Sequence, residues 1–149
     1  MPADSEGPVT LPHTWRPFGV RMAGAIAGIG LFAICAVAWF AFDAATRAKF
    51  TPFQRGTLVG LGLMIFACGY ALTRSRVVAE TSRLVVVNGY RRHVYEWPEV
   101  ISISLPRGAP WAMLDLANGT SQAVMGIQGS DGDRAIRAVR ELRQILRAG

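Results

Sequence analysis

Two long, uncharged apolar segments lie close together in the first half of the chain. They cover residues 22–42 and 56–72, and neither contains a charged side chain. As helices that rise about 1.5 Å per residue, they are roughly 31 Å and 25 Å long, and a hydrocarbon core is about 30 Å thick. Because only residues 43–55 join them, the sequence predicts a two-helix transmembrane hairpin. A second span following the first favours a membrane anchor over a cleaved leader.

The remaining sequence divides into a short tail and one small domain. Residues 1–14 contain Pro2, Gly7, Pro8 and Pro12 with little apolar content, so we expect a disordered N-terminal tail. The hairpin is assigned to residues 15–74, and residues 75–149 form the domain. About 75 residues can bury only a thin hydrophobic core.

Positive charge near the spans predicts the orientation of the hairpin. Seven basic residues flank it on the side of the termini: Arg16, Arg21, Arg74, Arg76, Arg83, Arg91 and Arg92. The connecting segment carries three: Arg47, Lys49 and Arg55. By the positive-inside rule, we expect a multi-pass plasma-membrane protein with both termini in the cytoplasm. Aromatic residues near the span ends, Trp15 among them, fit interfacial positions.

The composition of the spans argues against transport. Neither span has an ionisable residue that a transported ion or proton requires. Gly24 and Gly28 form a G-x-x-x-G pattern, which favours close helix packing within the hairpin, with homodimerisation as the alternative use. Cys35 and Cys68 lie in the middle of the spans, where thiols are usually inert packing residues.

The domain sequence reads as short antiparallel strands. Asn88-Gly89 and Asn118-Gly119 each separate two strand-like runs and predict β-hairpins, the first with a type I′ turn. Pro98 and the segment 106–110 interrupt further runs, giving six or seven strands. Trp97 and Trp111 are expected to lie in the core.

A helix is predicted to close the domain. Its apolar stripe consists of Ile136, Val139, Leu142, Ile145 and Leu146. Ser130 or Asp131 suits its N-cap, and Asp133 suits its first turn. The expected fold class is α+β: a transmembrane hairpin followed by a small antiparallel β-barrel or sandwich capped by a C-terminal helix.

Several strings resemble one family over roughly residues 14–147. They are residues 50–58, 84–92, 95–97, 110–112 and 126–133. Together with the strand order and the Trp97-Pro98-Glu99-Val100 segment, they resemble the actinobacterial family named after mycobacterial low-molecular-weight protein antigen 6. The resemblance implies a membrane protein with a bacterial pleckstrin-homology-like (PH-like) domain. It implies no established activity and no settled ligand.

The sequence offers no catalytic constellation, so we expect no enzyme, no metal and no cofactor. His13 and His93 are the only histidines, and neither stands in a nucleophile or zinc motif. His93 is interpreted as a strand-pairing residue. Residues 130–133 lack the spacing of a calcium loop and are interpreted as a turn with a helix cap.

The expected function is that of an adaptor at the cytoplasmic face of the plasma membrane, holding an unidentified protein partner. The alternative is a surface module that senses anionic lipid. Arg83, Arg91 and Arg92 are the candidate contacts for partner or lipid. The net charge of +6 is not accompanied by a base-stacking ladder, so nucleic acid is not an expected partner.

Overall fold

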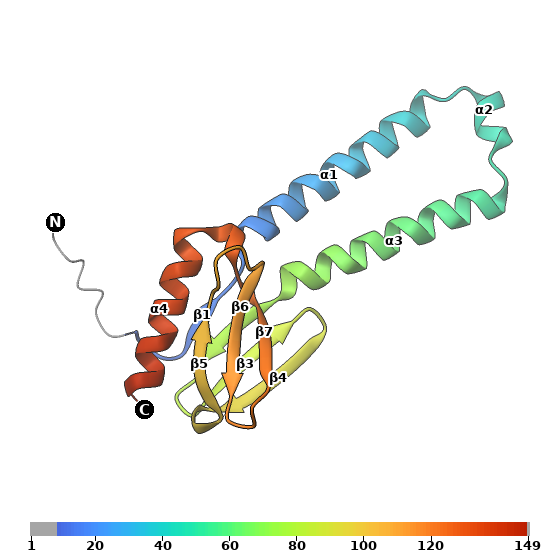
Figure 1. Ribbon diagram of the computed structural model, residues 1–149. Helices are drawn as coiled ribbons and strands as arrows, with labels where there is room; N and C mark the ends of the chain where they lie inside the picture. Colours follow the sequence, from blue (N-terminus) through green and yellow to red (C-terminus); the bar gives the residue numbers. More distant parts are fainter. Residues whose placement is uncertain (1–8, 149) are drawn as a thin grey trace, which may run out of the picture.

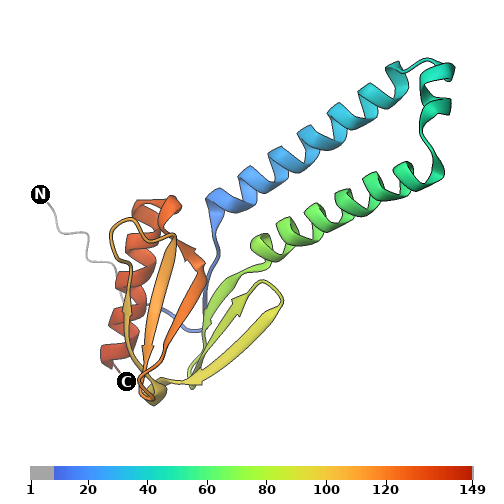
Figure 2. The ribbon, with the colours of Figure 1, turned by 45° about the vertical axis from the view of Figure 1, so that its right-hand side comes forward.

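Two long helices project from a small β-rich domain in the computed structural model, which describes residues 9–148 (Figure 1). The helices are α1 (Phe18–Ala41) and α3 (Pro52–Arg74), and the short helix α2 (Ala44–Lys49) joins them. The two long helices diverge with distance from the domain, as Figures 1 and 2 both show. Gly24 lies against Thr73 near the base, whereas a Cβ at Gly28 would meet no atom within 4 Å. Only the first glycine of the G-x-x-x-G pattern therefore lies in the helix contact.

Local capping signals explain where the helices begin. The predicted spans of residues 22–42 and 56–72 lie in α1 and α3, and both helices begin four residues earlier than predicted. Thr51 and Gln54 form a capping box before α3, and Pro52 occupies its first turn. The Asp43 side chain accepts a hydrogen bond from the Thr46 amide and caps α2 with this single bond.

The surfaces of α1 and α3 are apolar and uncovered. The helices contain 24 and 23 residues, which gives lengths of about 36 Å and 34 Å. Neither contains a buried residue, and Phe32 and Phe66 are 77% and 71% exposed. By length and composition both are candidate membrane spans. Exposing so large an apolar surface to water would be unfavourable, because burying apolar surface stabilises a protein by about 25 cal/mol per Å².

The domain contains two separate antiparallel sheets. The first has the order β1 (His13–Trp15), β2 (Arg76–Ala79), β3 (Arg83–Asn88), β4 (Arg91–Glu96). The second has the order β5 (Val100–Ser104), β6 (Trp111–Leu116), β7 (Ser121–Gln128). Two 3₁₀ turns, η1 (Trp97–Glu99) and η2 (Gly129–Asp131), and the final helix α4 (Asp133–Ala148) complete it.

The two sheets pack against each other without closing into a barrel. Strands β2 and β3 contact β7, and α4 covers β5 and part of β7 (Figure 1). The expectation of a barrel is therefore wrong, and its alternative of a sandwich capped by a helix describes the layers better. The turn η1 lies between β4 and β5, and Pro98 in it has no backbone N–H to continue a ladder.

Strand β1 precedes the two long helices in the sequence, whereas the other strands follow them. It nevertheless belongs to the first sheet of the domain. Trp15 pairs with Val77 and His13 pairs with Ala79. Of the predicted tail, residues 1–8 lie outside the described part, whereas His13 and Thr14 are in this strand, so a disordered tail to residue 14 is wrong. A strand of 3 residues carries too little periodicity to predict.

Both predicted Asn-Gly hairpins are confirmed, with one difference in turn type. Asn88 pairs with Arg91, so Gly89 and Tyr90 are the central residues of the first turn. Gly89 has φ of 61°, and no non-glycine residue described has a positive φ. This pattern matches a type II′ turn, with glycine at the first central position, rather than type I′.

The core lies between the sheets and α4. Leu84, Leu114 and Leu142 are completely buried in it, and α4 also buries Val139 of the predicted stripe, whereas Ile136 is 52% exposed. The tryptophans are distributed differently from the prediction. Trp15 is buried in this core instead of lying at a membrane interface; Trp97 packs against the cluster, and half-buried Trp111 does not belong to it.

Candidate functional site

The base of α1 is fastened to the domain by Asp131 of η2. Its carboxylate accepts hydrogen bonds from the backbone amides of Phe18, at 2.9 Å, and Gly19, at 2.8 Å. These amides belong to the first turn of α1, which has no side-chain cap of its own. Ser130 or Asp131 was predicted as the N-cap of α4, and that prediction is wrong, because both lie in η2 and α4 begins at Asp133. Asp131 caps α1, which lies more than a hundred positions earlier in the sequence, so no local sequence pattern could predict this role.

Two more contacts surround this cap. The Arg134 guanidinium of α4 lies 4.3 Å from the centre of the Phe18 ring, a cation–π distance. The Trp15 indole N–H donates to Glu141 of α4 at 2.7 Å. We name the contacts of Asp131 and Arg134 with the start of α1 the first latch.

The end of α3 is fastened to the β3–β4 turn. The Tyr90 hydroxyl donates to the carbonyl of Ala67 at 2.8 Å, one to two turns before the helix ends. The Gly89 amide donates to the Ser75 hydroxyl at 3.0 Å, and that hydroxyl donates to the Ala71 carbonyl at 3.3 Å. Ser75 is fully buried. We name these contacts of the turn with α3 and Ser75 the second latch.

The three predicted site arginines do not form one site. Arg91 and Arg92 follow the turn of the second latch and are exposed. Arg83 lies at the opposite end of the same hairpin, where it pairs in register with Glu96 and forms an ion pair with Glu80. Five residues of strand, about 17 Å, separate the two ends. The sequence contained this information, because counting from the Asn-Gly turn places Arg83 opposite Glu96.

A polar groove lies where the two helices meet the domain. Its volume is about 340 Å³, and Arg16, Arg21, Tyr70, Thr73, Arg74 and Arg76 line it. In the sequence, the four arginines served only as evidence for the orientation of the hairpin. Arg16 and Arg21 lie at the start of the helical hairpin and Arg74 and Arg76 at its end, and this placement could have predicted that the four lie together. We name this feature the arginine groove.

The positive charge of the arginine groove is not neutralised by the part of the chain described here. Within residues 9–148, no carboxylate oxygen lies within 4.0 Å of any of its four guanidinium groups. The Asp131 carboxylate is the acidic group of the first latch and is engaged by two amides. Guanidinium groups present planar, bidentate donors that suit phosphate and carboxylate oxygens.

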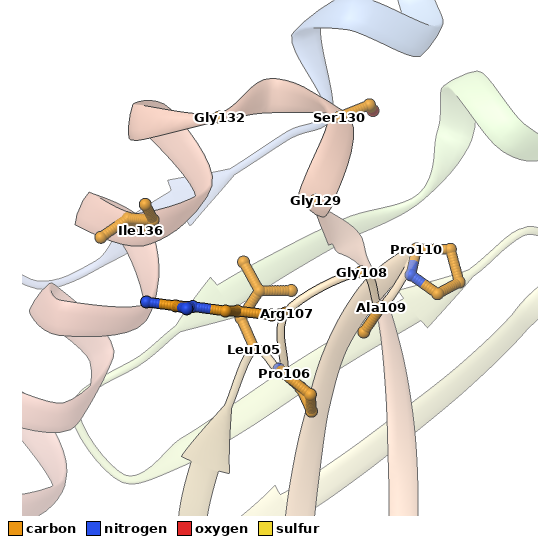
Figure 3. A pocket seen from close by; sticks show the side chains of 10 residues that line it. All are labelled: Leu105, Pro106, Arg107, Gly108, Ala109, Pro110, Gly129, Ser130, Gly132 and Ile136. Carbon is orange, nitrogen blue, oxygen red and sulfur yellow. The ribbon is translucent and has the colours of Figure 1, made fainter.

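A second, larger cavity lies between the β5–β6 loop and the start of α4 (Figure 3). Its volume is about 440 Å³. In Figure 3, Arg107 extends from the loop toward α4, and Ile136 lies on the helix above it. The remaining lining is mostly glycine, proline and alanine, so Arg107 is its one charged group. Such a lining offers no set of converging polar groups that would bind a specific ligand.

The polar clusters elsewhere are structural. His93 pairs with Val86 in the sheet, which confirms its interpretation as a strand-pairing residue. Asp115 accepts hydrogen bonds from the hydroxyls of Ser102, at 2.6 Å, and Ser121, at 3.0 Å. These bonds stabilise the charged form and lower the pKa of Asp115 below 3.8. Among the described residues, no group of three or more His, Cys, Asp or Glu could hold a metal ion.

The domain is similar in sequence to known bacterial proteins. Residues 74–144 match the family model described as bacterial PH domain. Uncharacterized proteins of Mycobacterium tuberculosis and Mycobacterium bovis are 36% identical over 86 residues, covering 58% of this chain. The matched part spans 56% of each relative, little more than half of its length. No solved structure matches the chain.

These matches support the bacterial PH-like assignment without the narrower antigen family, which stays a prediction. The matched segment begins at the end of α3 and covers both hairpins, the second sheet and most of α4. Residues 74–144 are therefore similar to the bacterial PH domain family and form a PH-like domain with antiparallel sheets and a C-terminal helix.

Proposed function

We propose that this chain is a non-enzymatic adaptor, which anchors a PH-like domain at the cytoplasmic face of the plasma membrane. The observation that carries the proposal is the pair of latches. Asp131 fastens the domain to the start of α1, and Tyr90 fastens it to the end of α3. A domain held at both helices cannot rotate freely about either junction, so it presents one fixed surface to the cell interior.

The helices supply the anchor. Their exposed apolar side chains match the hydrocarbon core, and helical backbones satisfy their own hydrogen bonds in lipid. Basic residues are more numerous beside the domain than in the connection around α2. The positive-inside rule then places the domain and both termini in the cytoplasm.

The surface for a protein partner is the edge of the first sheet. Strand β4 is the last strand of that sheet, and Val94 on it is 44% exposed. Arg91 and Arg92 add positive charge at its membrane-proximal end. An extended segment with acidic side chains can add to such an edge through main-chain hydrogen bonds and pair with the two arginines.

Two measurements test the proposal, and the first concerns the anchor. In a chain with Cys35 and Cys68 replaced by alanine, single cysteines are placed at Ala45 in α2 and Ile101 in β5. We expect an impermeant maleimide to label the α2 position in intact cells and the Ile101 position only after permeabilisation. Labelling of Ile101 in intact cells would overturn the cytoplasmic placement.

The second measurement concerns the partner surface. A photo-crosslinking residue at Val94 is expected to give a defined adduct in living cells. Arg91→Glu combined with Arg92→Glu should weaken it, because these substitutions reverse the charge beside the edge. The matched pair Arg137→Glu and Arg140→Glu, on the exposed face of α4, should leave it unchanged. Absence of an adduct, or equal loss with both pairs, would contradict an adaptor that uses this edge.

Anionic lipid is the second candidate partner, and one observation favours it. The second latch holds the β3–β4 turn against α3, so Arg91 and Arg92 lie close to the membrane if α3 spans it. Each basic residue near an anionic leaflet adds about 1 kcal/mol of attraction. Arg83 is excluded from this surface by its distance along the hairpin and its ion pair with Glu80.

A further inference from the structure

The arginine groove lies at the level where both long helices enter the domain. Arg21 is in the first turn of α1, Arg74 is in the last turn of α3, and Arg76 begins β2. Arg16 lies between Trp15 and Pro17, which are both buried. Arginines from α1, α3 and β2, and one from the segment between β1 and α1, therefore line one space because the fold fixes the backbone of each.

Tyr90 of the second latch contacts the wall formed by α3. The Arg74 guanidinium lies 6.0 Å from the centre of the Tyr90 ring, at the outer limit of a cation–π contact. The Tyr90 hydroxyl is itself bonded to Ala67, so the ring is fixed by the second latch. Tyr70 and Thr73 of α3 add hydroxyl groups to the lining. Because the Thr73 hydroxyl donates to the Tyr70 carbonyl, the neutral donor beside the arginines is the Tyr70 hydroxyl.

The arginine groove is positively charged because of its side chains, not because of the helix dipoles. The positive end of the α1 dipole and the negative end of the α3 dipole lie at the same level and offset each other. The four arginines have no carboxylate within 4.0 Å among residues 9–148. Like charges held together without a counter-charge repel one another, so an anion bound between them would stabilise the groove.

The position of the groove selects the kind of anion. Above it, the sides of α1 and α3 are apolar and exposed, with Met22 of α1 49% and Leu72 of α3 45% exposed beside the arginines. A ligand with a phosphate at the groove and hydrocarbon along the helices would contact both surfaces at once. The volume of about 340 Å³ is at the small end of the range of ligand sites.

We propose that the arginine groove binds the phosphate of an anionic phospholipid headgroup, whose acyl chains lie along α1 and α3. This inference rests on the proposed membrane insertion of the two helices. It places the lipid contact at the junction between hairpin and domain, next to the exposed Arg91 and Arg92 surface, because Val87 of β3 pairs with both Arg76 and Arg92. A lipid bound there bridges three elements and holds the domain against the membrane in addition to the two latches.

The test uses the full chain, purified in detergent and mixed with phosphatidylglycerol or phosphatidylcholine, with bound lipid counted by native mass spectrometry. The wild-type chain should prefer phosphatidylglycerol. Arg16→Gln combined with Arg21→Gln should weaken that preference about tenfold or more, because two basic contacts are removed. The control pair Arg137→Gln and Arg140→Gln removes the same charge from the exposed face of α4 and should bind as the wild type does.

Three further outcomes separate the explanations. Equal phosphatidylglycerol binding by wild type and the Arg16/Arg21 variant overturns the groove as the site. Displacement of the lipid by equimolar glycerol phosphate shows a site for soluble phosphate esters and overturns the lipid assignment. Flotation of the wild-type chain with vesicles at alkaline pH tests insertion independently; loss from the vesicles overturns the anchor itself, whatever the arginine result.

Discussion

The carboxylate of Asp131 lies 2.8 Å from the backbone nitrogen of Gly19, although 112 positions separate them in the sequence. The contact joins the start of an apolar helix to the turn before the last helix of the PH-like domain. A flexible linker would leave the domain free to rotate relative to the two long helices. Here β1 belongs to the domain, the helices α1 to α3 follow it in the sequence, and the rest of the domain comes after them (Figure 2). Asp131 in that later part binds the start of α1.

Removing the cap should loosen the start of α1. Asp131→Ala leaves the Phe18 and Gly19 amides without their acceptor, and loss of a helix N-cap costs about 1–2 kcal/mol. We expect a lower unfolding temperature and faster hydrogen exchange of these two amides in the purified full chain. Asp133→Ala, two residues away and exposed, is the control and should change exchange at Phe18 and Gly19 little.

For the substitution Gly19→Ala, packing and helix propensity predict opposite effects on the stability of the chain. Alanine normally stabilises a helix relative to glycine by about 1 kcal/mol. A Cβ at Gly19, however, would lie 2.8 Å from the Asp131 carboxylate oxygen and push it away from the amides. Thermal unfolding should therefore show that Gly19→Ala destabilises the chain, whereas Gly28→Ala, with open space around it, does not. Stabilisation by both substitutions would show that the first latch is not closed.

One hydrogen bond of the second latch comes from the Tyr90 hydroxyl. Tyr90→Phe keeps the ring beside Arg74 and removes the donor to the Ala67 carbonyl. A typical hydrogen bond contributes about 0.5–1.5 kcal/mol, and we expect a loss of that size in unfolding free energy. Hydrogen exchange of the Gly89 amide should quicken at the same time. Tyr70→Phe, on the same side of α3, is the comparison and should leave Gly89 protected.

Asp115 gives a prediction on pH. Its hydrogen bonds from Ser102 and Ser121 lower the pKa in the folded chain below 3.8, the value of a free aspartate. A lowered folded-state pKa contributes stability that is present above about pH 3.8 and is lost as the pH falls through the folded value. An NMR titration of the Asp115 carboxyl should show a midpoint below 3.8, and Ser102→Ala should raise it. A midpoint unchanged by that substitution would contradict the assigned cause.

Local signals in the sequence predicted most of the elements. The uncharged runs gave both long helices, the Asn-Gly pairs gave two hairpins, and the apolar spacing from Ile136 to Leu146 gave α4. Each of these patterns depends on residues within one element or one turn. Their ends differed by a few residues because caps such as Thr51 lie outside the apolar pattern.

The parts that sequence reasoning missed depend on contacts between distant segments. Trp15 looked like a membrane-interface residue because it precedes an apolar run, but pairing of β1 with β2 carries it into the core. Asp131 looked like a cap for the next helix in sequence and instead caps α1. Arg83 was grouped with Arg91 by nearness in sequence, although the hairpin register separates them.

The two latches hold the domain in one orientation relative to α1 and α3, and a distance measurement between hairpin and domain checks this. With Cys35 and Cys68 replaced by alanine, spin labels at Phe53 in α3 and Ile101 in β5, which are 81% and 65% exposed, report on hairpin and domain in lipid nanodiscs. Double electron–electron resonance should give a single narrow distance distribution, which broadens when Asp131→Ala and Tyr90→Phe are combined. A broad distribution in the chain with both latches intact would contradict the account.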